Sequence, residues 1–572
     1  MTSELAAGSP VPPSTGIGRA SAVLASGTIV SRVLGFISTV VLANTLGLVG
    51  VSANTFSIAN QLPNNIYAII AGGLLSAILV PQIVRAGQDA DGGEKFINRV
   101  VTLGIVAFLV VALIATILAS PLVHLYAQQQ TSGSTRGLST ADFKLATAFA
   151  YWCLPQVFFY ALYSLIGEVL NARKVFGPFT WAPVVNNLVA IAGLLTFNLL
   201  FASVQRSDSS VWTSGMIALI GGSATLGVVG QAVFLVFFWR RAGLHYRPEF
   251  RWRGVGLGRV GKAAFWTFLM IVITQLAGIV QSKIATLAGS HNASNAVLRF
   301  AWLIFMLPHG IITISIATPY FTRMSGHAHR GDFDALRRDI GASLRTIGML
   351  LLFACVALII VANPLAAVFS RHSSAAHAMA AVLVAYLVGL LPFSVVFVLQ
   401  RAFYALEDTR TPFLFQTLQS VLLVSGMLVS ATLPGSSIAF GIAVSTTVAD
   451  FALVLVAALL LRRRMHRLDA IAVARSYLVF LIALVPAAAA GIGLDFALGA
   501  LSGGPAWSAG SAQSGGFALS GFALSGILPA IVSVAAIGAA MAVVYFGVLA
   551  LLRAPELTEL TQPLLRRIRP GR

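Results

Sequence analysis

The chain has few acidic residues, few charges of any kind and almost no cysteine. Only 18 of its 572 residues are Asp or Glu, and charged residues together make up 10%, against about a quarter in an ordinary soluble domain. That scarcity excludes a soluble enzyme, a disordered chain and a coiled coil. Cys153 and Cys355 lie inside apolar runs, so we expect small core residues without a disulfide.

Apolar sequence is abundant instead, with 58% hydrophobic residues and a mean hydropathy of +0.88. A helix that spans a bilayer needs about 20 mostly apolar residues. Fourteen such runs predict an all-α polytopic membrane protein. They lie near 20–47, 53–84, 97–120, 145–170, 179–202, 212–239, 260–288, 295–322, 341–370, 375–406, 411–432, 435–461, 472–497 and 526–552.

Most of the basic residues lie on one side of the predicted membrane. Lys and Arg total 37 and give a formal charge of +19, but the apolar spans between them argue against a nucleic-acid partner. With the N-terminus inside, the cytoplasmic segments hold 29 of the 37, as the positive-inside rule requires. We therefore expect a multi-pass membrane protein with both termini in the cytoplasm.

The chain resembles itself at an offset of 237 or 238 residues. Residues 71–86 align with 309–324, and 154–173 align with 391–410. The shift spans six helices, so the copies share one orientation, as parallel repeats of transporters do. We predict two six-helix lobes with a substrate site between them, plus two further helices. The expected segments are a tail (1–19), an N-lobe (20–240), a basic loop (241–259), a C-lobe (260–461), two helices with an external Gly/Ser-rich loop (472–552) and a basic tail (553–572).

Polar side chains inside the membrane usually face a cavity or a partner. Arg32 lies near mid-bilayer, and Asn60, Asn64 and Tyr67 recur at helical spacing, so they share a face that lines a cavity or binds helices together. The candidate substrate-binding residues are Arg32, Asn54, Asn60, Gln61, Asn64, Tyr67, Lys283 and Arg299. For Lys283 and Arg299, snorkelling to the interface is an equal alternative.

Other residues are expected to have structural roles. Pro63 interrupts the second run. Glu168 is within reach of Arg173 or Lys174, Arg401 is within reach of Glu407, and Asp450 fits a hydrogen-bonded core position. Asp408 follows the tenth run. We found no ATPase or hydrolase motif and no set of metal ligands, so we expect no catalytic residue, cofactor or metal.

Four stretches together resemble a known family. They are SGTIVSRVLGFISTVVLANTLG (26–47), NQLPNNIYAIIAGGLLSAILVPQ (60–82), VLNARKVFGPFTWAPVVNNLVAI (169–191) and RAFYALEDTRTPF (401–413). They are similar to the MurJ/MviN family of lipid II flippases, which shares a superfamily with the MATE exporters. The third stretch looks like actinobacterial members, here without the pseudokinase extension that some carry.

The resemblance implies a transporter of the bacterial plasma membrane that moves lipid-linked peptidoglycan precursor to the outer leaflet by alternating access. It implies a polyprenyl-diphosphate glycan and membrane lipids as partners, cell-wall synthesis or division proteins as further candidates, and a cavity role for Arg32. The chain departs from the family's cavity charges at Ser38, Thr39, Asn54, Tyr67, Gly72 and Leu303. Three alternatives stay open: a flippase for another polyprenyl-linked glycan, a cation-coupled exporter, and a scaffold that has lost transport.

Overall fold

The computed structural model describes residues 15–568 apart from 87–90, 92, 132–134, 174, 176, 203, 205–207, 251–256, 290, 371, 466 and 502–520. Side chains are described except in 15–25, 70–85, 257–264, 500–501, 521, 524 and 562–568. The expected tails, the basic loop and the Gly/Ser-rich external loop therefore lie wholly or partly outside the described residues.

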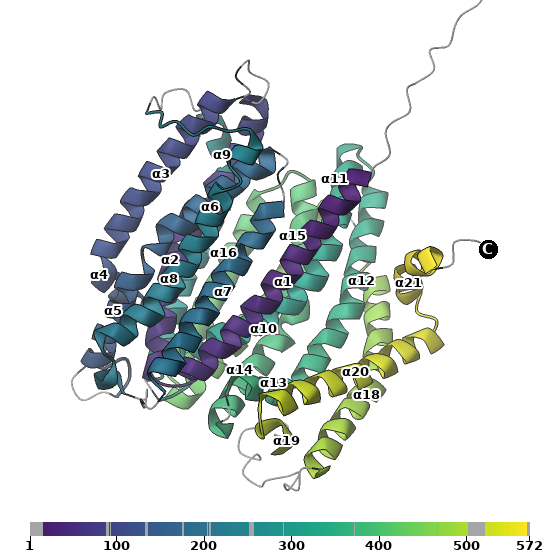
Figure 1. The fold of residues 1–572 in the computed structure, drawn as a ribbon. Helices are drawn as coiled ribbons and strands as arrows, with labels where there is room; N and C mark the ends of the chain where they lie inside the picture. Colours follow the sequence, from purple (N-terminus) through teal and green to yellow (C-terminus); the bar gives the residue numbers. More distant parts are fainter. Residues whose placement is uncertain are drawn as a thin grey trace, which may run out of the picture.

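The described chain is helical throughout (Figure 1). Its longer helices are α1 (Thr15–Leu46), α2 (Val51–Ala86), α3 (Glu94–Ile117), α4 (Ala119–Tyr126), α5 (Thr140–Cys153), α6 (Gln156–Ala172), α7 (Gly177–Leu200), α8 (Ser214–Val236), α9 (Leu257–Thr286), α10 (Asn295–Pro308), α11 (Ile314–His329), α12 (Phe333–Ile360), α13 (Ala362–Phe369), α14 (Ser373–Val388), α15 (Leu390–Ala405), α16 (Arg410–Ser430), α17 (Ile438–Met465), α18 (Ala470–Leu501), α20 (Ile527–Leu551) and α21 (Pro555–Ile568). Short elements are η1 (Ser209–Val211), η2 (Arg240–Ala242), η3 (His309–Thr313), η4 (Gly435–Ser437) and α19 (Gly521–Leu524).

Thirteen helical segments of the described chain are long and apolar enough to cross a membrane. They match thirteen of the runs expected from the sequence. The remaining run, 53–84, forms α2, whose side chains are described only as far as Ile69 before Ala86. The expected fold class is confirmed: the protein is an all-helical, multi-pass membrane protein.

Two spans in each half break at corresponding places. Leu118 separates α3 from α4 with φ −86° and ψ 20°, and Val361 separates α12 from α13 with φ −88° and ψ 10°. Likewise, α5 gives way to α6 at Pro155, and α14 gives way to α15 shortly before Pro392, where proline cannot donate a helix hydrogen bond. The shared breaks are the structural counterpart of the sequence repeat, so we name α1–α8 the N-lobe and α9–α17 the C-lobe.

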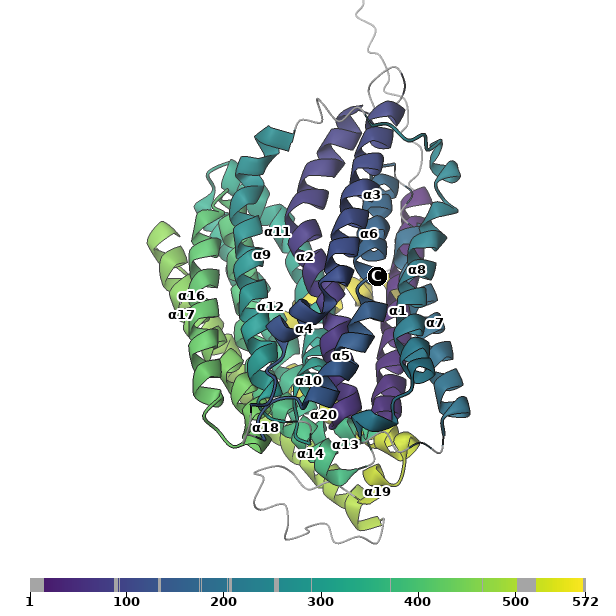
Figure 2. The ribbon, with the colours of Figure 1, turned by 90° about the vertical axis from the view of Figure 1, so that its left-hand side faces the viewer.

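The two lobes lie side by side, with the last helices on the outer flank of the C-lobe (Figures 1 and 2). Helices α18 and α20 contact each other and α12, and α20 also contacts α13. The Tyr545 hydroxyl donates to the Met349 carbonyl at 2.9 Å, and that of Tyr477 donates to the Leu344 carbonyl at 3.0 Å. These buried bonds fix the additional pair of spans to the C-lobe.

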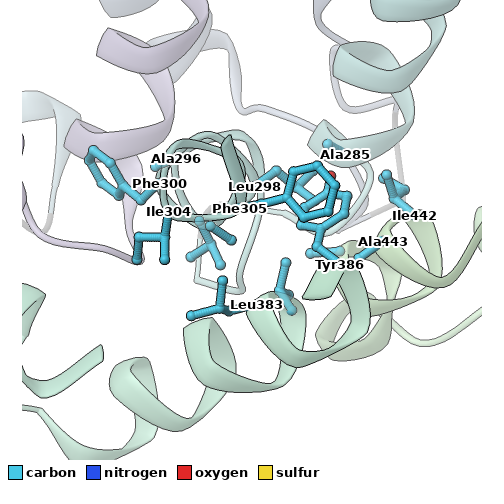
Figure 3. Close-up of a cluster of buried hydrophobic side chains, with 14 of the residues drawn as sticks. Ala285, Ala296, Leu298, Phe300, Ile304, Phe305, Leu383, Tyr386, Ile442 and Ala443 are labelled. Carbon is cyan, nitrogen blue, oxygen red and sulfur yellow. The ribbon is translucent and has the colours of Figure 1, made fainter. Parts of the chain in front are cut away.

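Aromatic side chains fill the interior of the C-lobe. The rings of Trp302 and Phe305 stack with centroids 4.7 Å apart, and Phe305 lies 5.5 Å from Phe393 and 6.0 Å from Tyr386. Figure 3 shows Phe305 and Tyr386 near Leu383 and near Ile442 and Ala443 of α17. Such contacts bury large apolar areas in preferred ring geometries, so this lobe has an apolar, close-packed centre.

The lobes are tied together at one end of the molecule, which we call the far face: the end where α1 finishes and α2 begins. Four hydrogen bonds between described residues join the lobes there. They are Asn44 Nδ2 to the Val368 carbonyl (3.1 Å), the Ala296 amide to Asn54 Oδ1 (3.3 Å), the Gln128 amide to Thr286 Oγ1 (2.8 Å) and Arg136 Nη2 to the Leu433 carbonyl (2.5 Å). The end where α1 begins is the terminal face.

Candidate functional site

A polar cavity of about 190 Å³ lies inside the N-lobe, and one side chain of the C-lobe reaches into it. The N-lobe lining comes from α1, α2, α6, α7 and α8, and the C-lobe contributes Arg299 from α10. The polar lining residues are Ser38, Thr39, Asn60, Gln156, Tyr160, Asn186, Asn187, Ser223 and Arg299. They supply one cation together with amides and hydroxyls.

Arg299 is held in the cavity by Asn60. With the amide of Asn60 turned so that its oxygen faces α10, that oxygen accepts hydrogen bonds from Arg299 Nη1 at 3.3 Å and Nη2 at 3.1 Å. The Arg299 side chain stays accessible within the cavity although protein surrounds it. A guanidinium has five donors in a fixed fork, so this one keeps donors for an anion.

The wall opposite is built from amides that anchor neighbouring helices. Gln156 begins α6, and its Nε2 donates to Thr225 Oγ1 at 3.0 Å, while its buried Oε1 has no protein partner. Asn187 Nδ2 donates to the Ser31 carbonyl at 3.0 Å and joins α7 to α1. An unpaired buried acceptor costs free energy, so Gln156 Oε1 is an unsatisfied polar atom in the protein beside the cavity.

Arg32 lies outside this cavity, against the C-lobe. A Cβ placed on Gly310 would lie 2.9 Å from Arg32 Nη1, so the guanidinium rests on the Gly310 backbone. Gly310 belongs to η3, a π-helical turn between α10 and α11, and such turns are frequent at functional sites. His309 of the same turn is buried and shares a 2.9 Å hydrogen bond with Ser394. Both candidate arginines therefore contact the other lobe.

The structure separates the polar residues of α2. Asn60 lines the cavity, and Tyr67 lies beside it with its ring 5.8 Å from that of Tyr160. Asn54 is buried against the start of α10 through the Ala296 amide. Gln61 and Asn64 are not among the lining residues, and Asn64 is exposed. The expected stripe thus divides between the cavity and the interface between the lobes.

The remaining candidates lie away from the cavity. Lys283 is exposed near the far-face end of α9, Pro63 is buried in α2, and Glu168 is half-buried on α6. Arg401 is 5.2 Å from the Phe321 ring centroid and 4.8 Å from that of Phe397, a pair of cation–π contacts rather than the expected neighbourhood of Glu407.

Two acidic side chains accept hydrogen bonds at or between helices. Asp408 Oδ1 accepts from the amides of Arg410 and Thr411, and Oδ2 accepts from the Thr411 hydroxyl, so it caps the start of α16. Asp450 is buried and accepts from Gln419 Nε2 at 2.5 Å, which confirms the expected hydrogen-bonded core position.

Sequence reasoning missed Gln156, Tyr160 and Ser223 as cavity residues. One signal was present: Gln156 is a polar residue directly after Pro155 in an otherwise apolar run, and Tyr160 follows one helical turn later. A helix start behind a proline directs these two side chains to one face. Ser223 carries no such signal, because it is placed by the close approach of α8 to Gly193 of α7.

Most of the chain is similar in sequence to known proteins. Residues 42–500 match the family model described as "Lipid II flippase MurJ". A Vibrio cholerae protein named probable lipid II flippase MurJ is 27% identical over 442 residues, covering 75% of this chain and 80% of the relative. A Haemophilus influenzae protein of the same name is 26% identical over 399 residues, covering 67% and 75%.

Solved structures agree in fold. A lipid II flippase MurJ in an inward closed conformation matches with a TM-score of 0.66 and 18% identity, covering 92% of this chain and all of that one. A multidrug resistance MATE family transporter of the MOP superfamily, in an inward-facing conformation, matches with a TM-score of 0.54 and 15% identity, covering 77% and 93%. Because the family model spans well over half of its length, this chain belongs to the lipid II flippase MurJ family.

Proposed function

We propose that this chain moves lipid II, the polyprenyl-diphosphate-linked precursor of peptidoglycan, from the cytoplasmic to the outer leaflet by alternating access of its two lobes. The single observation that carries the proposal is Arg299 of the C-lobe in a polar cavity of the N-lobe. Membership of the MurJ family supports it. In this proposal cell-wall synthesis or division proteins act on the same pathway.

The cavity chemistry suits a diphosphate headgroup. Arg299 can donate charge-assisted hydrogen bonds to phosphate oxygens, while the amides and hydroxyls beside it can bind sugar and peptide groups. Because Asn60 offers only a neutral carbonyl, a phosphate would compete favourably for the guanidinium. Exchange of these partners would break one link between the lobes and so couple binding to their movement.

The proposal includes an orientation. The terminal face would lie in the cytoplasm, because the loops and tails on that side carry most of the 37 basic residues. The far face would then be the external side, and the four hydrogen bonds there would hold it shut while substrate enters from the inner leaflet. Arg32, which rests on Gly310, would serve as a second cation on the route.

The test is a lipid II leaflet assay in a bacterium whose own MurJ-family flippase is depleted. Rescue by the wild-type chain should restore lipid II on the outer leaflet and normal cell shape. We expect Arg32→Ala and Arg299→Ala to fail, whereas Arg462→Ala, an exposed arginine at the end of α17, should rescue fully.

Three outcomes would contradict parts of the proposal. Normal outward lipid II after clean depletion, with no second flippase present, would remove lipid II as the substrate. Intact peptidoglycan with loss of another polyprenyl-linked polymer would identify a different glycan. Full rescue by both arginine variants would show that neither guanidinium is needed, and would remove the observation that carries the proposal.

A further inference from the structure

A second pocket lies where α20 turns into α21, on the flank of the C-lobe and apart from the polar cavity (Figure 1). Its volume of about 570 Å³ falls in the range of small-molecule sites, about 300–1,000 Å³. The lining residues are Leu549, Ala550, Arg553, Ala554, Leu557, Thr558 and Thr561. Most of this lining is apolar, and it contains one charged group.

Within the described part of the chain, that charged group has no protein partner. Among the described residues the Arg553 side chain makes no ion pair and no hydrogen bond. The two hydroxyls of the lining are already used, because Thr558 bonds to the Ala554 carbonyl and Thr561 to the Leu557 carbonyl. An apolar pocket with one free guanidinium fits an amphipathic molecule with an anionic head.

The wall of the pocket is fixed to the rest of the protein. Glu556 is buried on the other side of α21, where it pairs with Arg345 Nε at 3.2 Å and accepts from Ser476 Oγ at 2.8 Å. Arg553 itself has φ 51°, a left-handed conformation that is unusual for a residue other than glycine. A backbone conformation of this kind persists only where the surrounding structure enforces it, and such residues are often found at ligand sites.

The pocket lies at the depth of lipid headgroups. The membrane span α20 ends at Leu551, which is 83% exposed, and the next residue, Leu552, is 50% exposed. Arg553 is therefore the first charged residue after the exposed apolar end of α20. In the sequence, Arg566, Arg567, Arg569 and Arg572 come shortly after it, and basic clusters beside a membrane span attract anionic lipids.

We propose that this pocket binds one anionic phospholipid, with its phosphate on Arg553 and an acyl chain against Leu549 and Leu557. The site would be filled by lipid of the surrounding leaflet and does not depend on which molecule the protein transports. It would attach the additional spans, and through Glu556 the C-lobe, to the membrane surface.

The test uses the purified full-length chain in detergent. Native mass spectrometry and thermal melting are measured with phosphatidylglycerol and with phosphatidylcholine of the same acyl chains. Arg553→Asn removes the charge but keeps a residue type that tolerates positive φ. Arg463→Asn, which removes an exposed arginine at the end of α17, is the matched control.

We expect phosphatidylglycerol to bind the wild type and Arg463→Asn equally and Arg553→Asn about fivefold more weakly, the effect of about one surface charge. Thr558→Phe, which fills the pocket and keeps Arg553, should also weaken binding. Melting of each variant without lipid shows that it is folded.

Three results would overturn the proposal. They are equal binding of the two phospholipids to the wild type, unchanged phosphatidylglycerol binding by folded Arg553→Asn and Thr558→Phe, and a site that takes undecaprenyl phosphate but not phosphatidylglycerol. The last result, measured by the same titration with undecaprenyl phosphate, would assign the pocket to a polyprenyl lipid. Loss of flippase activity with phosphatidylglycerol binding intact would instead count only against the proposed function.

Discussion

The two lobes follow the same chain path but have different interiors. At the repeat offset of 237 residues, Gln156 of the N-lobe cavity pairs with Phe393, and Tyr160 pairs with Phe397. Phe393 and Phe397 both contact the buried His309. Polar side chains at these positions line a cavity in the N-lobe, whereas aromatic rings fill the same positions in the C-lobe. In the proposed function, the N-lobe would bind substrate and the densely packed C-lobe would move against it.

The largest effect is expected at Arg299, the C-lobe side chain that lines the N-lobe cavity. Arg299→Ala should lower lipid II export by at least about tenfold, because it removes a cation that no other lining residue replaces. Arg299→Lys should recover only part of the loss, since an ammonium cannot donate in the same fork. The leaflet assay measures both variants, and full activity of Arg299→Ala would show that the cavity is not used.

Exchanging the residues at the paired repeat positions 156 and 393 would test whether their polarity causes the difference between the two interiors. Gln156→Phe should fill the cavity and abolish export while the protein still folds. The reciprocal Phe393→Gln should lower the free energy of unfolding by about 1–3 kcal/mol, because it replaces a half-buried, packed ring with an amide. Thermal melting in detergent measures folding, and a Gln156→Phe protein with normal export would refute the division of roles.

The far-face links should have a smaller effect. Arg136→Ala removes one hydrogen bond between the lobes and should favour their separation by about 1 kcal/mol, or about fivefold in population. Distances between spin labels at Thr213 and Ser437, on the two lobes, would report the shift. Lys144→Ala, a charge change on the N-lobe side of this face without a bond to the C-lobe, is the control. Identical distance distributions would argue that Arg136 does not hold the face closed.

The smallest effect concerns Asp408, whose repeat partner is Asn171. Burial alone would raise the pKa of Asp408, but hydrogen bonds from the amide and hydroxyl of Thr411 outweigh it, so the pKa is lowered. The ionised carboxylate therefore stabilises the fold above its unfolded pKa, and this contribution is lost as the pH falls through the folded pKa. Asp408→Asn should cost about 0.5–1 kcal/mol at neutral pH and progressively less on acidification. Melting temperatures across that range would measure it, and a gap independent of pH would exclude the charge as its cause.

The sequence predicts the parts of this structure that depend on local pattern. Span positions follow from apolar length, and the break at Pro155 follows from a residue that cannot donate within a helix. The repeat is visible because such local signals occur twice in the same order. Asp450 was expected to be hydrogen-bonded because no charge lies near it in the sequence.

The sequence could not predict which lobe receives Arg299. Its position near the start of a span allowed snorkelling as readily as insertion, and only the packing of α10 against α2 decides between them. Arg401 shows the same limit, because Phe321 lies 80 residues earlier in the chain and gives no local sign of the contact. Contacts between distant elements depend on the assembled fold rather than on a residue's neighbours in sequence.

In the proposed function, the bonds that close the far face would also limit the passage of ions across the membrane. At about 1 kcal/mol each, the four bonds contribute about 4 kcal/mol to closure, a factor of about a thousand in the ratio of closed to open molecules. A water-filled cavity that opened freely would conduct ions and drain the membrane potential. A cell can therefore keep many copies of this transporter in its membrane at little energetic loss.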